Sequence, residues 1–465
     1  VVSDVDIVWN RVDEASTPRR RHVTNRKNGA GSGPGENRNS LLARQYHSDC
    51  LYNSCIDLGL VGLLASALFI VRFRVLSFEV ACVVCRTPLF PQKLLVGCPN
   101  LGERERLLDR CRDILERRWL TNNGEFVQAF ERQIADYLGV RHCIAVANAT
   151  IGLQMAARAL DLTGEVIVPS FTFPATAHAL AWVGITPVFC DVELATHNID
   201  PTKIEALIGP QTTGILAVHL WGNPCAVDSL RKIADRHRLR LFFDAAHAFG
   251  CSHDGRMIGN FGDAEVFSFH ATKFVNSAEG GAITSNDDGL ADRLRRMRNF
   301  GFDQEQVVEV GTNAKMCEFA AAVGLTSLEC REQFLECNRD NYAAYQRVLA
   351  DAVGFELLAV DDSQQHNRQY IVVDVDARAV GVTRDDVLSV LHAENVMAKR
   401  YFFPGCHRLE PFQRLAGRVR QPLSHTERLC ERLIQLPTGT AVDETKIERI
   451  GMLLKSLSAR ARRAA

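Results

Sequence analysis

The sequence predicts an α/β fold with a largely parallel sheet, and three features of its pattern support this prediction. Short apolar runs alternate with segments of helical periodicity between about residues 94 and 330. Several of these runs are apolar throughout, as in strands whose two faces are both covered by helices. Beyond that region the alternation gives way to a separate strand and helix, which predicts a smaller α+β domain. We therefore expect three parts, at residues 1–92, 93–330 and 331–465.

Composition limits the classes of function. The chain has 465 residues, a formal net charge of −1 and 23% charged residues, which is typical of a soluble globular protein. Nucleic-acid binders normally carry a clearly basic face, so we expect small-molecule or protein partners and no nucleic acid. The 15 cysteines are scattered, which indicates reduced thiols in a cytoplasmic protein. Cys82 and Cys85 form a C-x-x-C without a second pair at zinc-ribbon spacing, and we interpret them as ordinary apolar residues.

The first 92 residues differ from the rest of the chain. Residues 26–40 are rich in Gly, Ser and Asn and predict a flexible segment. Residues 51–71 have the length of a membrane span, but Asp57 interrupts them and their uncharged core, 58–71, is short for a bilayer. An inserted anchor therefore stays an alternative, while we favour an appended stretch without a fold of its own. The apolar core lies too far from the N-terminus for a secretory signal.

The elements of the folded part follow in order. Residues 100–120 place apolar side chains at helical spacing among charges, and a second helix over 124–140 follows a turn at "TNNG". Six β-rich runs come next: "CIAVANA", "EVIVPS", "TPVFCDV", "GILAVHL", "LRLFFDA" and "EVFSFH". Near the C-terminus, "NRQYIVVDVDA" predicts a strand and "TRDDVLSVLHAENV" predicts a helix. Reactive side chains in such folds gather where parallel strands end at their carboxyl edge.

Two strand ends carry polar residues with two interpretations each. The turn Asn148-Ala149-Thr150 places N–H groups and a hydroxyl at a helix N-terminus, which suits a phosphate. Ordinary helix capping uses the same residue types. Asp244 ends a strongly apolar strand, three residues before His247. Its carboxylate either holds a proton on a heteroaromatic nitrogen or caps the helix that "AAHAFG" suggests.

A third strand-like run, "EVFSFHATK", ends at Lys273, with Ser268 five residues earlier. A lysine withdrawn from water has a lowered pKa and becomes a nucleophile toward carbonyls. An isolated lysine at a strand end is more often a solvated cation. The phosphate-binding turn, Asp244 and Lys273 together supply the anion cradle, carboxylate and Schiff-base amine that pyridoxal phosphate requires.

From about Leu94 to the C-terminus the sequence resembles the pyridoxal-phosphate sugar aminotransferases, the DegT/DnrJ/EryC1/StrS family of fold type I. Several long motifs in the family's order carry the resemblance: "RWLTNNGEFVQAFE", "VPSFTFPATAHAL", "FFDAAHAFG", "FSFHATKFVNSAEGGAI", "RNFGF", "GTNAKMCEFAAA" and "RYFFPGCHRLEPF". The resemblance implies a mixed, mostly parallel seven-stranded sheet with helices on both faces. It also implies a homodimer with shared active sites.

The resemblance assigns roles to residues within these motifs. Lys273 would form the Schiff base with the cofactor and move protons, and Asp244 would pair with the pyridinium nitrogen. Six further positions match residues that contact the cofactor. His247 matches a residue that contacts the 3-hydroxyl, and Phe173 matches the aromatic residue that stacks on the ring. The positions that match phosphate-binding residues are Ser268, Ala149, Thr150 and, reaching the neighbouring subunit, Asn313. Six others match positions that contact substrate: Thr121, Asn122, Asn123, His270, Tyr401 and His407. The phosphate turn reads Asn-Ala-Thr where many members have Ser-Gly-Thr, which changes a side-chain contact and keeps the hydroxyl.

The implied reaction is a transamination in amino-sugar, polysaccharide or glycosylated-metabolite biosynthesis. An amino acid, glutamate by analogy, would supply the amino group, and a nucleotide-linked keto-deoxysugar would receive it. The motifs "SFHATK" and "EGG" favour a dTDP-4-keto-6-deoxyhexose, and a 3-ketosugar stays open. The family's dehydratase branch has histidine in place of Lys273, which argues against that activity. A non-catalytic regulatory homologue, tethered to a membrane if residues 51–71 insert, is disfavoured by the intact Lys273 and Asp244.

Overall fold

The computed structural model describes residues 87–414 and 419–464 of the chain. The predicted flexible segment 26–40, the apolar window 51–71 and the Cys82–Cys85 pair all lie outside the described residues. Among the helices of the described ranges, none combines the length and the apolar character needed to cross a membrane.

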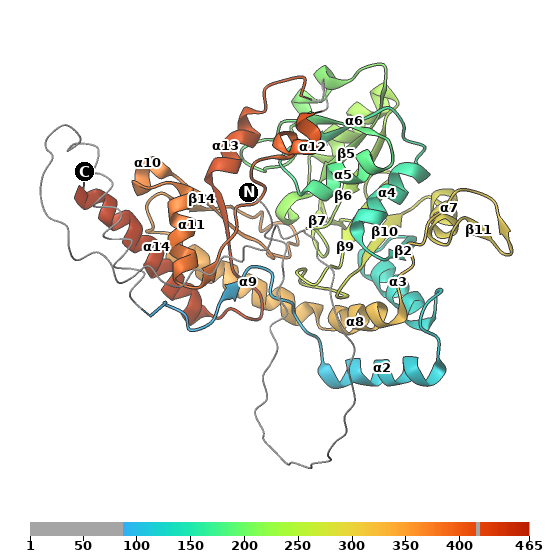
Figure 1. Cartoon of the computed structure of the whole chain (residues 1–465), viewed down its shortest axis with the longest axis horizontal. Helices are drawn as coiled ribbons and strands as arrows, with labels where there is room; N and C mark the ends of the chain where they lie inside the picture. The colour runs from blue at the N-terminus through green and yellow to red at the C-terminus, as the bar shows by residue number, and fades with distance from the viewer. Residues whose placement is uncertain (1–86, 415–418, 465) are drawn as a thin grey trace, which may run out of the picture. The chain divides into compact units, whose positions relative to one another are not determined.

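A seven-stranded mixed sheet lies at the centre of the larger part of the fold (Figure 1). Its strand order is β2-β10-β9-β6-β5-β3-β4. The β10 strand is antiparallel to both of its neighbours, and the other pairs in the sheet are parallel. This arrangement confirms the predicted mixed, mostly parallel sheet. The strands are β2 (His142–Val146), β3 (Glu165–Pro169), β4 (Thr186–Cys190), β5 (Thr212–Val218), β6 (Arg240–Asp244), β9 (Ala264–Ser268) and β10 (Gly281–Ser285).

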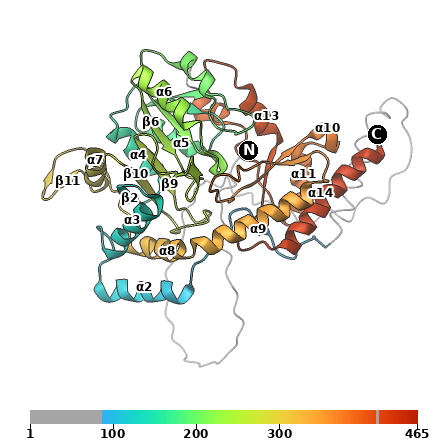
Figure 2. The same cartoon turned by 180° about the vertical axis from the view of Figure 1, so that it is seen from behind.

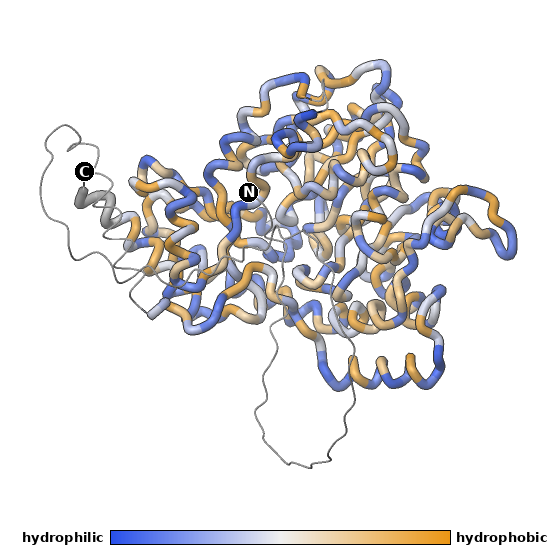
Figure 3. Tube along the Cα trace, in the orientation of Figure 1, coloured by the Kyte–Doolittle hydropathy of each residue, from blue (hydrophilic) through white to orange (hydrophobic). Residues whose placement is uncertain are grey.

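Helices cover both faces of this sheet, because successive strand residues point alternately to opposite sides (Figures 1 and 2). One face packs against α4 (Ala149–Ala159), α5 (Pro174–Trp182) and α7 (Asp288–Arg298). The other face packs against α3 (Glu125–Leu138), α6 (Val227–His237) and α8 (Glu318–Glu329). The α2 helix (Arg104–Arg117) lies against α8, where Arg110 pairs with Glu329 at 2.6 Å. Apolar residues recur along these strands, which are buried on both sides (Figure 3).

A second core forms around a three-stranded antiparallel sheet of β13 (Phe355–Leu357), β14 (Ile371–Val375) and β16 (Leu433–Leu436). It packs against α9 (Arg331–Leu349), α11 (Arg384–Ala393) and α14 (Glu444–Ala464). Phe90 is buried in the same cluster, so packing begins a few residues before the predicted start at residue 93. The division between domains near residue 330 stays a prediction.

Shorter elements complete the fold: β1 (Leu94–Leu95) with β15 (Val396–Met397), β7 (Ser252–His253) with β8 (Arg256–Met257), β11 (Phe302–Asp303) with β12 (Gln306–Val307), and the helices α10 (Ala377–Val380), α12 (Glu410–Gln413) and α13 (Ser424–Arg432).

The N-terminus of α3 is capped by a distant carboxylate. Gly124 at the N-cap offers no side-chain acceptor, and the buried Glu318 accepts hydrogen bonds from the N–H groups of Phe126 and Val127, both at 3.0 Å. A buried carboxylate at this position satisfies two N–H groups that lack intrahelical partners and also complements the helix dipole.

We expect Glu318→Gln to lower the free energy of unfolding by about 1–3 kcal/mol, because the amide replaces one acceptor oxygen with a donor and removes the charge. Urea denaturation would measure the change. Glu332→Gln is the matched control, because Glu332 is exposed in the first turn of α9. Equal losses in the two variants would contradict a capping role for Glu318.

Candidate active site

Lys273 lies in a loop and not at a strand end, so the prediction that it ends a strand is wrong. The β9 strand stops at Ser268, where it pairs with Gly281, the first residue of β10. The residues between these two positions form the connection at the edge of the sheet, and the Lys273 N–H donates to the His270 carbonyl at 2.8 Å. Lys273 therefore projects from a closed turn just beyond the carboxyl end of β9.

The Lys273 side chain is half-buried, and its amine contacts the phenol of Tyr370. Its Nζ donates a hydrogen bond to the Tyr370 hydroxyl at 2.8 Å. Burial lowers the pKa of Lys273 to about 8, against the opposing effect of the Asp244 carboxylate. A substantial fraction of the amine is therefore neutral near physiological pH, which is the form that attacks a carbonyl.

Asp244 ends β6 and is almost fully buried. Its Oδ2 accepts from the Thr176 hydroxyl at 2.8 Å and its Oδ1 accepts from the Ala246 N–H at 3.1 Å. Burial raises the pKa of the carboxyl, while these hydrogen bonds and the Lys273 charge act in the opposite direction. Both of these hydrogen-bond donors are neutral, so a cationic N–H group placed beside Asp244 would stabilise the ionised carboxylate in this buried position.

His247 lies three residues beyond Asp244, in a segment of turns, so no helix forms there for Asp244 to cap. Its ring stacks on Trp221 with centroids 5.6 Å apart and contacts Tyr370 at 4.2 Å. Burial lowers the pKa of His247, with a further contribution from Lys273, so the ring is neutral. The His247 Nδ1 accepts from the backbone N–H of Trp221 at 3.3 Å, so the proton of the His247 ring is assigned to Nε2.

The predicted phosphate-binding turn is the N-terminus of α4. The Asn148 side chain accepts from the Ile151 N–H at 2.9 Å, while the N–H groups of Ala149 and Thr150 have no intrahelical acceptor. Gly281 allows β10 to approach this turn, since a Cβ there would lie 2.7 Å from the Ala149 nitrogen. Ser268 is the register partner of Gly281, so the structure brings Ser268 to the same turn.

Phe173 lies at the N-cap of α5, one turn before the Thr176 that contacts Asp244, and its side chain is 55% exposed. Phe173 and Tyr401 line a cavity of about 210 Å³ together with Arg400. This cavity brings the predicted cofactor-stacking aromatic next to one of the predicted substrate residues.

The remaining predicted residues are dispersed. Thr121, Asn122 and Asn123 form the exposed turn between α2 and α3, and Asn313 is exposed. The His270 Nδ1 lies 2.9 Å from the Thr272 hydroxyl, and the half-buried His407 places its Nδ1 2.7 Å from the Ser170 hydroxyl. Within the described residues, none of these side chains hydrogen-bonds to the Lys273 amine or the Asp244 carboxylate, and their roles stay predictions.

Three residues of the site were missed by sequence reasoning: Thr176, Trp221 and Tyr370. Thr176 belongs to a quoted motif, and a hydroxyl in the first turn of a helix that follows a strand end is a recognisable signal. Trp221 follows a strand end in the same way. Tyr370 lies 97 residues from Lys273, and no local pattern indicates their contact.

The donor set fits pyridoxal phosphate. The amine of lowered pKa suits its aldehyde, and the buried carboxylate with neutral donors suits its pyridinium nitrogen. The helix N-terminus with its free N–H groups suits its phosphate. These three features lie at the end of β6, on the loop after β9 and at the start of α4, which follows β2. All three are therefore at the carboxyl ends of parallel strands of the seven-stranded sheet.

Solved and curated proteins share this fold over most of the chain. A solved structure, "Crystal Structure Analysis of DesI in the presence of its TDP-sugar product", has a TM-score of 0.79 and 50% identity, covering 82% of this chain and 97% of that one. The dTDP-4-amino-4,6-dideoxy-D-glucose transaminase of Escherichia coli is 34% identical over 360 residues, covering 77% of this chain and 96% of its own length. The GDP-perosamine synthase of Caulobacter vibrioides is 34% identical over 364 residues, with the same two coverages.

The fold and these relatives define a pyridoxal-phosphate-dependent aminotransferase of fold type I. The profile of the DegT/DnrJ/EryC1/StrS aminotransferase family matches residues 102–455, and the chain belongs to this family. The predicted family, fold class, enzyme class and cofactor are thereby confirmed.

Proposed function

We propose that the protein transfers an amino group from an amino acid, glutamate by analogy, to the C4 keto group of a dTDP-linked 6-deoxyhexose. The observation that carries the proposal is the Lys273 amine of lowered pKa, held beside the buried Asp244 in a chain of this family. Two relatives named for dTDP-4-amino-4,6-dideoxy-D-glucose support the choice of sugar and nucleotide. The DesI structure, which was analysed in the presence of its TDP-sugar product, supports the same choice.

Pyridoxal phosphate supplies an aldehyde that accepts the amino group and a ring that takes up the electrons released at the donor's α-carbon. The neutral Lys273 would bind that aldehyde and, once released, would carry the proton from the α-carbon on Nζ. Asp244 would keep a proton on the ring nitrogen, and the His247 Nε2–H would donate to the ring oxygen. Ser268 and the N–H groups of Ala149 and Thr150 would hold the phosphate.

The site would be completed in a cytoplasmic homodimer, with Asn313 reaching the cofactor phosphate of the neighbouring subunit. Asn313 is exposed, and the preceding β11–β12 hairpin and the residues just after it carry exposed apolar side chains, among them Val307 and Val310. Exposed apolar surface of this kind favours burial against a second copy. Thr121, Asn122, Asn123, His270, Tyr401 and His407 would contact the nucleotide sugar, and the chain would divide into domains near residue 330.

A panel of nucleotide ketosugars tests the proposed substrate. We expect the protein, incubated with glutamate, to convert dTDP-4-keto-6-deoxyglucose with a higher kcat/KM than the 3-keto isomer or the GDP- and UDP-linked 4-ketosugars. NMR of the product would place the new amine on C4. An amine on C3, or faster conversion of another nucleotide, would contradict the proposal, and no conversion with any donor would contradict the activity.

A further inference from the structure

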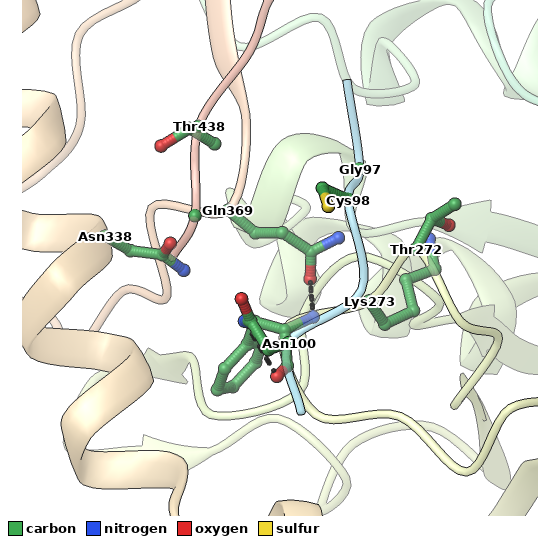
Figure 4. Close-up of a pocket in the computed structure, with 10 residues that line it drawn as sticks. Gly97, Cys98, Asn100, Thr272, Lys273, Asn338, Gln369 and Thr438 are labelled. Atoms are coloured by element: carbon green, nitrogen blue, oxygen red, sulfur yellow. Dashed lines mark hydrogen bonds between the residues drawn. The ribbon is translucent and has the colours of Figure 1, made fainter. Parts of the chain in front are cut away.

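Residues 367–370, directly before β14, contact both loops that carry the proposed cofactor-binding groups. Tyr370 accepts the hydrogen bond from the Lys273 amine at 2.8 Å. Gln369 accepts from the N–H of Phe274, the residue after Lys273, at 3.0 Å. Figure 4 shows the Gln369 side chain and its hydrogen bond to this backbone, and Asn100 lines the same pocket. The Asn100 amide donates to the Phe274 carbonyl at 3.1 Å, so both backbone polar groups of Phe274 are held by buried side chains.

Asn367 ties the same segment to the turn that follows Asp244. Its side-chain amide donates to the carbonyls of His247 at 2.8 Å and Phe249 at 3.0 Å. Asn367 and Gln369 are 1% and 9% exposed, so water does not compete for these bonds. The segment therefore fixes the Lys273 loop and the Asp244 loop relative to each other.

The backbone of this segment is held in an uncommon conformation. Arg368, between the two anchoring amides, has φ of 44°, in the left-handed region that non-glycine residues seldom adopt. Such a conformation persists only where the surroundings determine it. Here the Arg368 N–H donates to the His366 Nδ1 at 2.9 Å, and the Gln369 N–H donates to the Asn367 side chain at 3.1 Å. The position of the following residue, Tyr370, is thereby fixed.

The Tyr370 phenol is suited to hydrogen-bond an amine without transferring a proton to it. Burial raises the pKa of Tyr370 well above its ordinary value, so the phenol stays neutral. Its ring lies against His247 at 4.2 Å and Trp221 at 5.3 Å, which leaves its hydroxyl directed at Nζ. Among the described residues, the titratable groups near Lys273 include Asp244, His247, His270 and Cys98, the last of which lines a small cavity with Lys273.

We propose that Tyr370 is a positioning residue for Lys273, whose amine it holds whenever that amine is not bound to the cofactor, with Asn367 and Gln369 fixing the phenol from the same segment. The proposal rests on the proposed role of Lys273. A phenol oxygen that accepts from an ammonium group forms a charge-assisted bond, which is stronger than its bond to a neutral amine. Tyr370 therefore favours the protonated amine and partly offsets its desolvation.

The titration of Lys273 in the apoprotein tests this role without any catalytic step. Trace acetylation with acetic anhydride over a series of pH values, followed by peptide mass spectrometry, measures the neutral fraction of Lys273 relative to the exposed Lys232 in the same sample. We expect a midpoint near the lowered pKa of about 8 for the unsubstituted protein. In Tyr370→Phe, which keeps the ring and loses the hydroxyl, the midpoint is expected about 0.5–1 pH unit lower.

Tyr345→Phe is the matched control, because it removes another buried hydroxyl, which donates to the Pro437 carbonyl at 2.8 Å away from Lys273. Its midpoint is expected to equal that of the unsubstituted protein. A Tyr370→Phe midpoint that is unchanged or raised overturns the proposal, even if the variant loses activity. A failure of the proposed transamination would appear in the substrate panel and would leave this titration intact, so the two failures are distinguishable.

Discussion

Replacing Lys273 with alanine is expected to remove the visible absorption band of lysine-bound pyridoxal phosphate and to lower transamination by at least about 10³-fold. The same side chain is the proposed nucleophile and the proposed proton carrier, so its loss affects both functions. Absorption spectroscopy of the purified variant and steady-state kinetics would measure the two effects. Borohydride reduction of the unsubstituted protein, followed by peptide mapping, should place the pyridoxyl label on Lys273.

One further variant separates the chemistry of Lys273 from its charge, and a second, at an exposed lysine, serves as the control. Lys273→Arg keeps a cation near Asp244, but a guanidinium stays protonated and is no nucleophile, so we expect the same loss as with alanine. Lys232→Ala removes an exposed lysine of α6 and should leave the band and the rate unchanged. A label on another lysine, or a band retained in Lys273→Ala, would exclude Lys273 as the cofactor-binding residue.

Local patterns in the sequence were sufficient to predict the elements that build the site. The run "LRLFFDA" is apolar up to Asp244, and β6 ends at that residue. The small-residue turn at Asn148 marks the start of α4, because a polar N-cap follows an apolar strand. Both boundaries depend on residues that are neighbours in the chain.

Features set by contacts between distant residues were not accessible in the same way. The end of β9 depends on where β10 pairs with it. The apolar run alone predicted a strand that continues to Lys273, whereas β9 stops at Ser268. The capping of α3 by Glu318 joins residues separated by 191 or more positions, and the Tyr370–Lys273 contact spans 97. Such contacts follow from how elements that are distant in the sequence pack against one another, for which hydrophobic periodicity carries no signal.

Asp244→Asn is expected to separate cofactor binding from catalysis. The variant keeps Lys273, so the visible band should remain, while the turnover number is expected to fall by about 10²–10³-fold. An asparagine is nearly the size of aspartate and can still accept from Thr176 or Ala246, but it carries no charge to hold a proton on the ring nitrogen. Single-turnover kinetics with glutamate would locate the loss in the step that removes the α-proton.

Thr176→Val is the matched control for Asp244→Asn, since it removes one neutral hydrogen bond from the carboxylate and leaves its charge in place. We expect the loss of such a hydrogen bond to lower the turnover number by no more than about tenfold. Because burial already raises the pKa of Asp244, losing the Thr176 donor should raise it further, and the acid limb of the rate profile should move to higher pH. If Asp244→Asn instead kept turnover within about threefold of the unsubstituted protein, the charge at Asp244 would contribute little to the developing transition state, and the proposed electrostatic role would be wrong.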